Sequence, residues 1–363
     1  MSQSNPRPVN QLLRNQTHGA VGCIVATAPG KVILFGEHAI NRGQPALAAS
    51  VGLWARCRIC LRSEPGNVFL SGANQQAVSQ KSILDLTRQV DLARSHGNYE
   101  SIRQLAAEDY FGPAKYILGS ALGEQLPDGF SVEWESEIPA SSGLGSGGAA
   151  FAALVTALNG LLVKPASFEE LAAWAYRGDV VAHGGVASAL DTQTSLMGGI
   201  IRFAGQGLAQ AVACAEGFSL VIGNTGVAAS TREMNTRVRH WLEEKPASRL
   251  AFFEAMGALS RAALPLLEAG DWNELGRLFN LNQLALEKIG VSSPEINQLI
   301  EAAREAGALG AKLSGSGGGG IVIALVTSET QQRVARAIVE AGGTALLPEI
   351  GERGANVIDR RQI

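Results

Sequence analysis

The residues best suited to do chemistry lie in a glycine-rich segment, Pro139–Ala150, which reads Pro-Ala-Ser-Ser-Gly-Leu-Gly-Ser-Gly-Gly-Ala-Ala. It follows an alternating segment, Phe130–Glu135, and opens an apolar, alanine-rich stretch, Ser146–Leu162. Glycines let a backbone approach a ligand closely, and a helix N-terminus offers unpaired N–H groups and a positive dipole end to an anion. The segment therefore predicts a phosphate-binding loop between a half-buried strand and a buried helix. We expect the phosphates on Gly143, Leu144, Gly145, Ser146, Gly147 and Gly148.

Three other interpretations of this loop have to be weighed. Gly143, Gly145 and Gly148 match the Gly-x-Gly-x-x-Gly spacing of dinucleotide-binding folds. The strand before such a loop is covered on both faces and reads as a continuous apolar run, whereas Phe130–Glu135 alternates. The Walker-type loop Gly-x-x-x-x-Gly-Lys-Ser/Thr is absent. A glycine turn that serves only helix packing remains open for this segment taken alone.

Two more segments strengthen the phosphate-site interpretation. Ala28–His38 reads Ala-Pro-Gly-Lys-Val-Ile-Leu-Phe-Gly-Glu-His, and Lys312–Gly320 reads Lys-Leu-Ser-Gly-Ser-Gly-Gly-Gly-Gly. One glycine loop is weak evidence, but three such segments in one chain indicate a binding site built largely from backbone.

Composition narrows the class of protein. The chain has 363 residues, of which 46% are hydrophobic and 17% charged, so it is long enough for two globular domains. The formal net charge of -3 argues against a nucleic-acid partner or an anionic membrane surface. No apolar run approaches the roughly 18 residues of a membrane span.

The four cysteines favour a structural role. Cys57 and Cys60 form a Cys-x-x-Cys inside an expected strand, where residues three apart point to opposite faces, and no second pair completes a zinc site. We interpret them as plain structural cysteines. Few cysteines and no secretory signal favour a reducing cytoplasm.

The expected elements predict an α+β fold rather than a doubly wound parallel sheet. Gln80–Glu124 has helical spacing that Gly112-Pro113 interrupts, and the chain is helical in several pieces from Thr231 to Ala308. Ser167 and Glu170 predict a capping box at the start of a further helix. A domain boundary is expected near residue 200.

The three segments together resemble the kinases grouped with galactokinase, homoserine kinase, mevalonate kinase and phosphomevalonate kinase. Pro139–Ser146 matches their phosphate-binding loop, and Lys312–Gly320 matches their C-terminal glycine motif. Pro29–His38 matches the N-terminal motif in the form usual for mevalonate kinases. The order and spacing fit from about Ala26 to Ala324.

The resemblance implies a two-domain α+β kinase with mixed and antiparallel sheets, and with ATP and the acceptor in the cleft between the domains. Residues 1–20 would be a flexible tail, 21–200 the N-terminal ATP-binding domain and 201–363 the C-terminal domain. The implied reaction is Mg²⁺-dependent phosphorylation of the primary hydroxyl of mevalonate by ATP, in the cytoplasm, by a homodimer. Alternative acceptors are phosphomevalonate, homoserine or a sugar, and a protein of another class would be a catalytically inactive nucleotide-binding regulator.

The resemblance also implies roles for single residues. Asp191 would accept the proton of the acceptor hydroxyl, and Lys31 would keep Asp191 ionised and offset charge on the transferring group. Ser146 and Asp179 would bind Mg²⁺. The expected substrate-binding residues are Glu37, His38, Asn224, Thr231, Gly317 and Gly318.

The sequence departs from the family pattern at two points. The family loop runs Gly-Leu-Gly-Ser-Ser, and Gly147 replaces its second serine. The family also places a metal-binding Glu eleven residues before its catalytic Asp, where this chain has Val180. Asp179 is the nearest acid, so we assign the metal to it. Both departures keep the inactive regulator open as an alternative.

Overall fold

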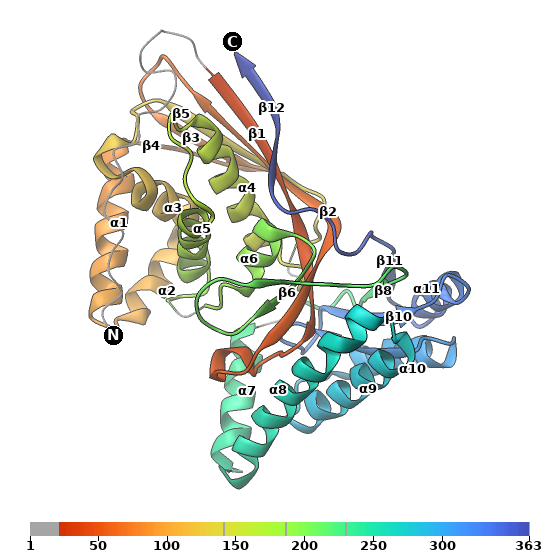
Figure 1. The fold of residues 1–363 in the computed structure, drawn as a ribbon. Coiled ribbons are helices and arrows are strands. Elements are labelled where there is room, and N and C mark those ends of the chain that lie inside the picture. Colours follow the sequence, from red (N-terminus) through yellow and green to blue (C-terminus); the bar gives the residue numbers. More distant parts are fainter. Residues whose placement is uncertain (1–21, 141, 186, 229–230, 245, 363) are drawn as a thin grey trace.

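The computed structural model describes residues 22–140, 142–185, 187–228, 231–244 and 246–362. The expected flexible tail, residues 1–20, lies outside the described residues. Two β-sheets organise the chain, and helices cover them (Figure 1). The α+β class with mixed and antiparallel sheets is therefore confirmed.

The first sheet has eight strands, in the order β12-β1-β2-β5-β3-β4, with β6 pairing with both β2 and β7. All its pairs are antiparallel except β3 with β5. The strands are β1 (Gly22–Phe35), β2 (Ala46–Leu61), β3 (Asn67–Ser71), β4 (Asn74–Val78), β5 (Phe130–Ser136), β6 (Ile200–Phe203), β7 (Gln210–Val212) and β12 (Asn356–Gln362).

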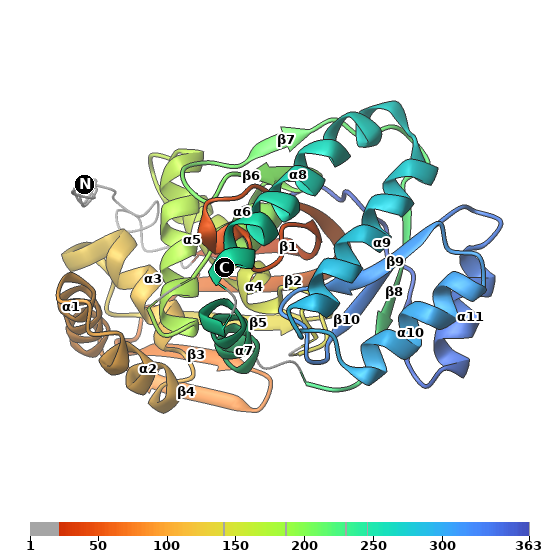
Figure 2. The ribbon, with the colours of Figure 1, turned by 90° about the horizontal axis from the view of Figure 1, so that it is seen from below.

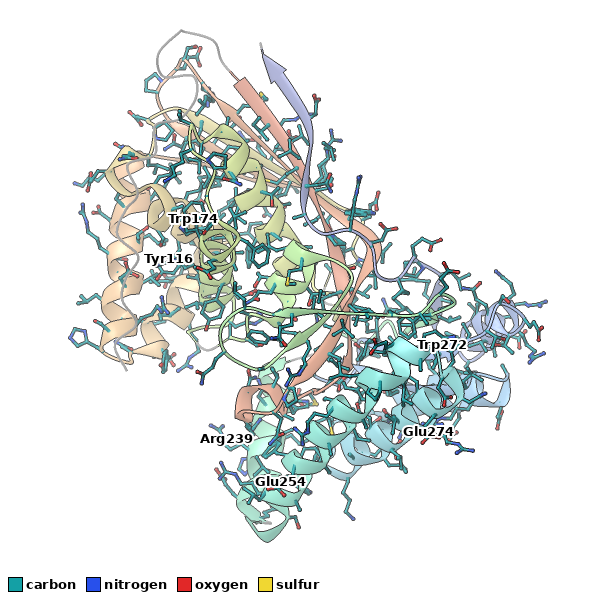
Figure 3. The ribbon with its side chains drawn as sticks, viewed as in Figure 1. Tyr116, Trp174, Arg239, Glu254, Trp272 and Glu274 are labelled. Atoms are coloured by element: carbon teal, nitrogen blue, oxygen red, sulfur yellow. A yellow bond between two sulfur atoms is a disulfide. The ribbon has the colours of Figure 1, made fainter. Side chains whose placement is uncertain are left out.

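Six helices accompany this sheet: α1 (Gln80–Ser95), α2 (Tyr99–Glu108), α3 (Gly112–Leu122), α4 (Ser146–Leu161), α5 (Phe168–Ala182) and α6 (Leu190–Met197). The helix α4 packs on β1 and β2, and α5 packs on α3 and α4. Ile24 and Ile59 from the sheet share one buried cluster with Leu154 from α4. Tyr116 and Trp174, labelled in Figure 3, lie within this helical layer.

The second sheet has four antiparallel strands in the order β11-β8-β10-β9: β8 (Ser219–Asn224), β9 (Gly310–Ser314), β10 (Ile321–Val326) and β11 (Thr344–Leu346). The helices of this part are α7 (Thr231–Glu244), α8 (Pro246–Ala269), α9 (Trp272–Lys288), α10 (Pro294–Glu305) and α11 (Gln331–Glu340). Figure 2 shows α9 and α10 beside the sheet.

The two faces of the second sheet belong to different cores, as the alternation of a strand requires. Val322 packs with α10 and α11, whereas Ile321 and Ile323 pack in a cluster that also contains Phe35 of β1 and Leu47 of β2. Hydrophobic contact therefore joins the two sheets. The division at residue 200 stays a prediction.

Most expected elements are present, with shifted ends. The residues on both sides of Pro29-Gly30 form one strand, β1, whose pairing with β2 changes register between Pro29 and Gly30. Gly112-Pro113 begins α3, because proline fits the first turn of a helix, where its missing N–H is not needed. The capping box of Ser167 and Glu170 is confirmed.

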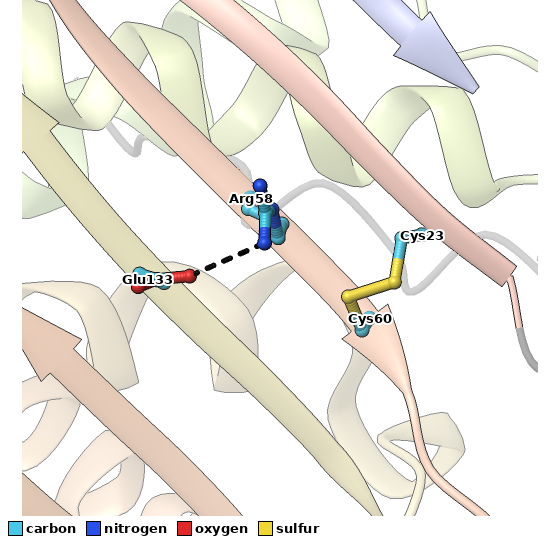
Figure 4. Close-up of a disulfide and its surroundings, with 4 residues drawn as sticks. All are labelled: Cys23, Arg58, Cys60 and Glu133. Carbon is cyan, nitrogen blue, oxygen red and sulfur yellow. Dashed lines mark ion pairs between the residues drawn. A yellow bond between two sulfur atoms is a disulfide. The ribbon is translucent and has the colours of Figure 1, made fainter. Parts of the chain in front are cut away.

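Two of the four cysteines, which the sequence predicted only as structural residues, are linked to each other. Cys23 of β1 and Cys60 of β2 are cross-strand neighbours and form a disulfide (Figure 4). Cys57 is a free thiol in the buried cluster under α4, so Cys57 and Cys60 do point to opposite faces. The sequence alone did not predict the disulfide, because the pairing of Cys23 with Cys60 depends on the register between two strands.

One helix among the described residues is long and apolar enough to span a membrane by length and composition. Ser248–Ala269, within α8, has a mean hydropathy of 1.4, and 33% of the window is buried. Charged residues such as Glu254 and Arg261 interrupt the run, which is why no span was expected from the sequence. Core helices pass the same test, so this is weak evidence.

Candidate active site

The glycine loop lies directly on β1. Gly143 and Gly145 have φ angles of 90° and 76°, which favour glycine, and Gly145 is the N-cap of α4. The N–H of Lys31 donates to the carbonyl of Leu144 over 2.8 Å. A Cβ on Gly145 would lie 2.7 Å from Cγ of Lys31, so the loop and the lysine stem pack without space for a side chain. The predicted helix start at Ser146 is confirmed.

Lys31 and Asp191 meet beside this loop. Nζ of Lys31 is 3.2 Å from Oδ2 of Asp191 and donates over 3.2 Å to the carbonyl of Gly143. Lys31 is buried, while the Asp191 side chain, in the first turn of α6, is 32% exposed. A Cβ on Gly148 would lie 3.0 Å from Cβ of Asp191. The structure thus brings together a lysine, a carboxylate and a helix N-terminus from three distant parts of the sequence.

Asp179 lies near this pair, in the last turn of α5. Burial raises the pKa of its carboxyl well above the usual 3.8, and the charge of Asp191 adds to the rise. A hydrogen bond with the Thr192 side chain acts in the opposite direction. Oδ2 of Asp179 has no hydrogen-bond partner among the described residues.

This arrangement fits a magnesium ion. A buried carboxylate oxygen without a partner, next to a second carboxylate, is stabilised by a hard divalent cation. No group of three or more acidic, histidine or cysteine side chains that could hold a metal occurs in the described part of the chain. Magnesium commonly takes only one or two carboxylates and completes its shell with phosphates and water, so Asp179 suits it as a carboxylate ligand.

Glu37 is engaged with a residue that sequence analysis did not assign to the site. Its Oε1 accepts a hydrogen bond from Nζ of Lys312, and both side chains are fully buried. Its Oε2 has no partner among the described residues. Burial raises the pKa of the Glu37 carboxyl and lowers the pKa of Lys312, while their mutual attraction opposes both shifts. The sequence signal that could have indicated Lys312 is a lysine within a short, otherwise largely apolar segment, Gly310–Ser314.

His38 lies in the turn after β1, with a φ of 59° that is rare for a residue other than glycine. Its Nε2 donates to the carbonyl of Ser316 over 2.9 Å, and it also bonds the Asn235 side chain. Burial lowers its pKa to about 4. His38 is therefore an uncharged hydrogen-bonding group at neutral pH.

The remaining candidates lie in the second part. A Cβ on Gly317 would meet the carbonyl of Val291 at 2.1 Å, so the glycine motif packs closely on its neighbour. Gly318, with a φ of 75°, packs on Met234 in the same way. Oδ1 of Asn224 accepts from the N–H of Gly226, so this side chain is used in the turn after β8. Thr231 begins α7, and its side chain lies outside the described residues.

The chain is similar to known proteins along most of its length. Residues 110–199 match the family model described as GHMP kinases N terminal domain, and residues 263–344 match GHMP kinases C terminal. A mevalonate kinase from Thermococcus onnurineus is 34% identical over 341 residues, covering 92% of this chain and 98% of that protein. A mevalonate kinase from Pyrococcus abyssi is 32% identical and covers 93% and 99%.

Solved structures share the fold. A mevalonate kinase of L. major in complex with R-mevalonate has a TM-score of 0.69 at 24% identity, covering 90% of this chain and 95% of that one. The Methanococcus jannaschii mevalonate kinase has a TM-score of 0.73 at 21% identity, covering 93% and 98%. A Lactococcus lactis galactokinase complexed with galactose also has a TM-score of 0.73, at 19% identity, covering 93% and 95%.

Proposed function

The chain belongs to the GHMP kinase family, and from this premise we propose that it is a mevalonate kinase. It transfers the γ-phosphoryl group of ATP to the primary hydroxyl of mevalonate, giving 5-phosphomevalonate and ADP. The observation that carries the proposal is the pairing of Lys31 with Asp191 beside the glycine loop. The match to mevalonate kinases over nearly their whole length supports this choice of acceptor.

Phosphoryl transfer needs positioning and charge stabilisation more than covalent chemistry. Asp191 accepts the proton of the acceptor hydroxyl as that oxygen attacks the γ-phosphorus. Lys31 pairs with the Asp191 side chain and offsets the charge that develops on the transferred group. The partly exposed carboxylate of Asp191 can reach an acceptor that binds beside the loop, while the buried Lys31 is held in place by the loop.

The polyphosphate binds the N–H groups of the loop and the first turn of α4. Its residues are Gly143, Leu144, Gly145, Ser146, Gly147 and Gly148. Asp179 and Ser146 hold Mg²⁺, which supplies positive charge to the phosphates when bound. The unpartnered oxygen of Asp179 supports this assignment, although the acid is one residue further from Asp191 than in the family pattern.

Mevalonate binds between the turn after β1 and the C-terminal glycine motif. His38 offers an uncharged ring, and Gly317 and Gly318 allow close approach of the backbone. Asn224 and Thr231 complete the proposed acceptor pocket. Glu37, whose side chain is fully buried on Lys312, acts on this pocket through the turn that carries His38. The proposal also includes a cytoplasmic location and a homodimer. It includes no nucleic-acid or membrane partner, and for this point the net charge of -3 is the support.

A coupled assay of ADP release tests the function. The purified protein is given Mg²⁺, ATP and one acceptor at a time: mevalonate, phosphomevalonate, homoserine or galactose. We expect turnover with mevalonate. Turnover only with another acceptor would move the chain to a different activity of the family. ATP binding without turnover on any acceptor would support the inactive regulator.

A further inference from the structure

The buried ion pair between Glu37 and Lys312 lies where the two parts of the molecule meet. Glu37 follows β1 of the first sheet, and Lys312 lies in β9 of the second. Both side chains have an exposed fraction of 0%. Nζ of Lys312 also donates to the carbonyl of Leu313 over 2.6 Å. The proposed reaction gives Lys312 no role, although this residue places a lysine at a fully buried position.

Stability alone is a poor reason for this pair. Taking two charges out of water costs free energy that their attraction often fails to offset, and apolar residues of similar size usually stabilise such a site at least as well. Phe279 lies with its ring centre 6.0 Å from Nζ of Lys312 and packs against Phe35. An apolar side chain at position 312 would therefore have apolar neighbours.

The alternation of β9 directs Lys312 toward the site. Ala311 and Leu313 pack in the cluster of α10 and α11, so Lys312 and Ser314 share the opposite face. Oγ of Ser314 accepts a hydrogen bond of 2.8 Å from the N–H of Ile33 in β1. Two residues further along the chain, the carbonyl of Ser316 accepts from His38. The ion pair and these two hydrogen bonds thus join this segment to β1 and to the turn that follows it.

Positive and negative side chains alternate from this pair to the reaction centre, in the order Lys312, Glu37, Lys31 and Asp191. Lys31 lies two residues before Ile33, whose N–H donates to Ser314 of β9, so Lys31 and Glu37 belong to the one segment that β9 contacts. In agreement with this placement, the charge of Lys312, and to a smaller extent that of Lys31, lowers the pKa of the Glu37 carboxyl. Lys31 in turn pairs with Asp191. Without Lys312, the carboxylate of Glu37 would be left buried, and it would compete with Asp191 for the positive charge of Lys31.

We propose that Lys312 is a positioning residue for phosphoryl transfer: it neutralises Glu37, so that Lys31 is left to Asp191. The proposal rests on the kinase function given above. It assigns Lys312 no contact with the substrate. Its effect passes through Glu37 to the geometry and charge of the Lys31–Asp191 pair.

The test compares Lys312→Met with the double variant Lys312→Met/Glu37→Gln. We expect Lys312→Met to lower kcat at least about tenfold with little change in the KM for ATP, because an uncompensated Glu37 draws Lys31 from Asp191. The double variant removes the competing carboxylate, so its kcat should exceed that of Lys312→Met severalfold. Removing the unpaired charge also restores stability, so both variants are assayed at a temperature at which thermal unfolding shows them to be folded. A gain in kcat between two folded variants is a result that a merely structural role would not give.

Lys115→Met is the matched control. Lys115 is also a buried lysine with one carboxylate partner, Asp109, at 2.6 Å, but it lies in α3. We expect this control to lose thermal stability and to keep kcat within about twofold. If Lys312→Met does not fold, as a thermal unfolding scan would show, Lys312→Gln takes its place in the same comparison.

The possible outcomes distinguish failure of the kinase function from failure of the role of Lys312. Wild-type protein without turnover on any acceptor overturns the kinase function and this proposal with it. A wild type that turns over, together with a Lys312→Met variant of normal kcat, overturns the role of Lys312 alone. A double variant no more active than the single one also overturns it, because Lys312 would then not act through Glu37.

Discussion

At the scale of single residues, the site depends on where each charge finds a partner. Asp191 has Lys31 and partial exposure to solvent, whereas Asp179 is buried with one oxygen unpartnered. Two carboxylates in such different surroundings suit two roles, one that accepts a proton and one that holds a cation. Gly147 removes one hydroxyl of the family loop. A side chain would fit there, because a Cβ would meet only the ring of Phe151, at the ordinary contact distance of 3.8 Å.

Asp191→Asn separates chemistry from nucleotide binding. The amide cannot accept the proton of the acceptor, so we expect kcat to fall at least about a hundredfold. The loop on α4 is unchanged, so the affinity for ATP, measured by calorimetry, should stay within a few fold. Asp85→Asn, which alters an exposed acid paired with Arg88, is the control. A kcat near normal in Asp191→Asn would exclude it as the base.

Asp179→Asn tests the metal site through stability as well as activity. A raised pKa means that the folded state holds the proton more tightly than the unfolded state. The stability due to Asp179 is therefore greatest below its usual pKa of 3.8 and is lost as the pH rises through the raised value. Without metal, the variant should be more stable than the wild type at pH 8 in urea unfolding.

The same variant should need more Mg²⁺ for half-maximal activity, because it lacks the charged oxygen that binds a hard cation. A magnesium titration identical to that of the wild type would place the metal elsewhere. A variant of lower stability at pH 8 would show that the Asp179 carboxylate has a partner when no metal is bound.

At the scale of elements, the sequence predicted those whose signals are local. The glycines before Ser146 and the alanine-rich run after it are enough to define the start of α4. The sequence did not predict the strand β9. Its five residues, Gly310–Ser314, show no alternation of polar and apolar side chains and continue directly into the glycine motif. The pairing of Glu37 with Lys312 could not be derived, because it joins positions 275 residues apart that meet only in the folded chain.

The disulfide is an element-scale constraint that links β1 to β2 across 37 residues. Closing a loop of this length restricts the unfolded chain, so we expect a Cys23→Ser/Cys60→Ser variant to lose about 2–4 kcal/mol of unfolding free energy. Equilibrium urea unfolding measures the loss. Cys214→Ser, at an exposed free thiol, should change nothing. Equal stability of the double variant and the wild type would show that the bond does not form in solution.

At the scale of the whole molecule, the site is where two sheets meet. A shared core holds Phe35 and Leu47 of the first sheet against Ile323 and Phe279 of the second part. Polar contacts cross the same junction at Ser314, Ser316 and Lys312. The three motifs recognised in the sequence are therefore far apart in the chain and adjacent in the fold. The family resemblance predicted that these motifs lie close together, whereas their spacing in the sequence alone could not predict it.

His38 makes one of these crossings sensitive to pH. Its pKa is about 4 in the folded protein against a usual 6.5, so between these values the unfolded state binds the proton more tightly. The stability it contributes is complete above pH 6.5 and is lost as the pH falls to about 4. The difference corresponds to about 3 kcal/mol for a group this deeply buried.

His38→Gln removes this titration while keeping a side chain that can donate to the carbonyl of Ser316. We expect the wild type to lose about 3 kcal/mol more unfolding free energy than the variant between pH 7 and pH 4, measured by urea unfolding. His96→Gln, at an exposed position of the first part, is the control. Parallel pH profiles for the wild type and His38→Gln would mean that the ring is open to solvent. The junction between the two sheets would then be looser at the acceptor pocket than the contacts of His38 require.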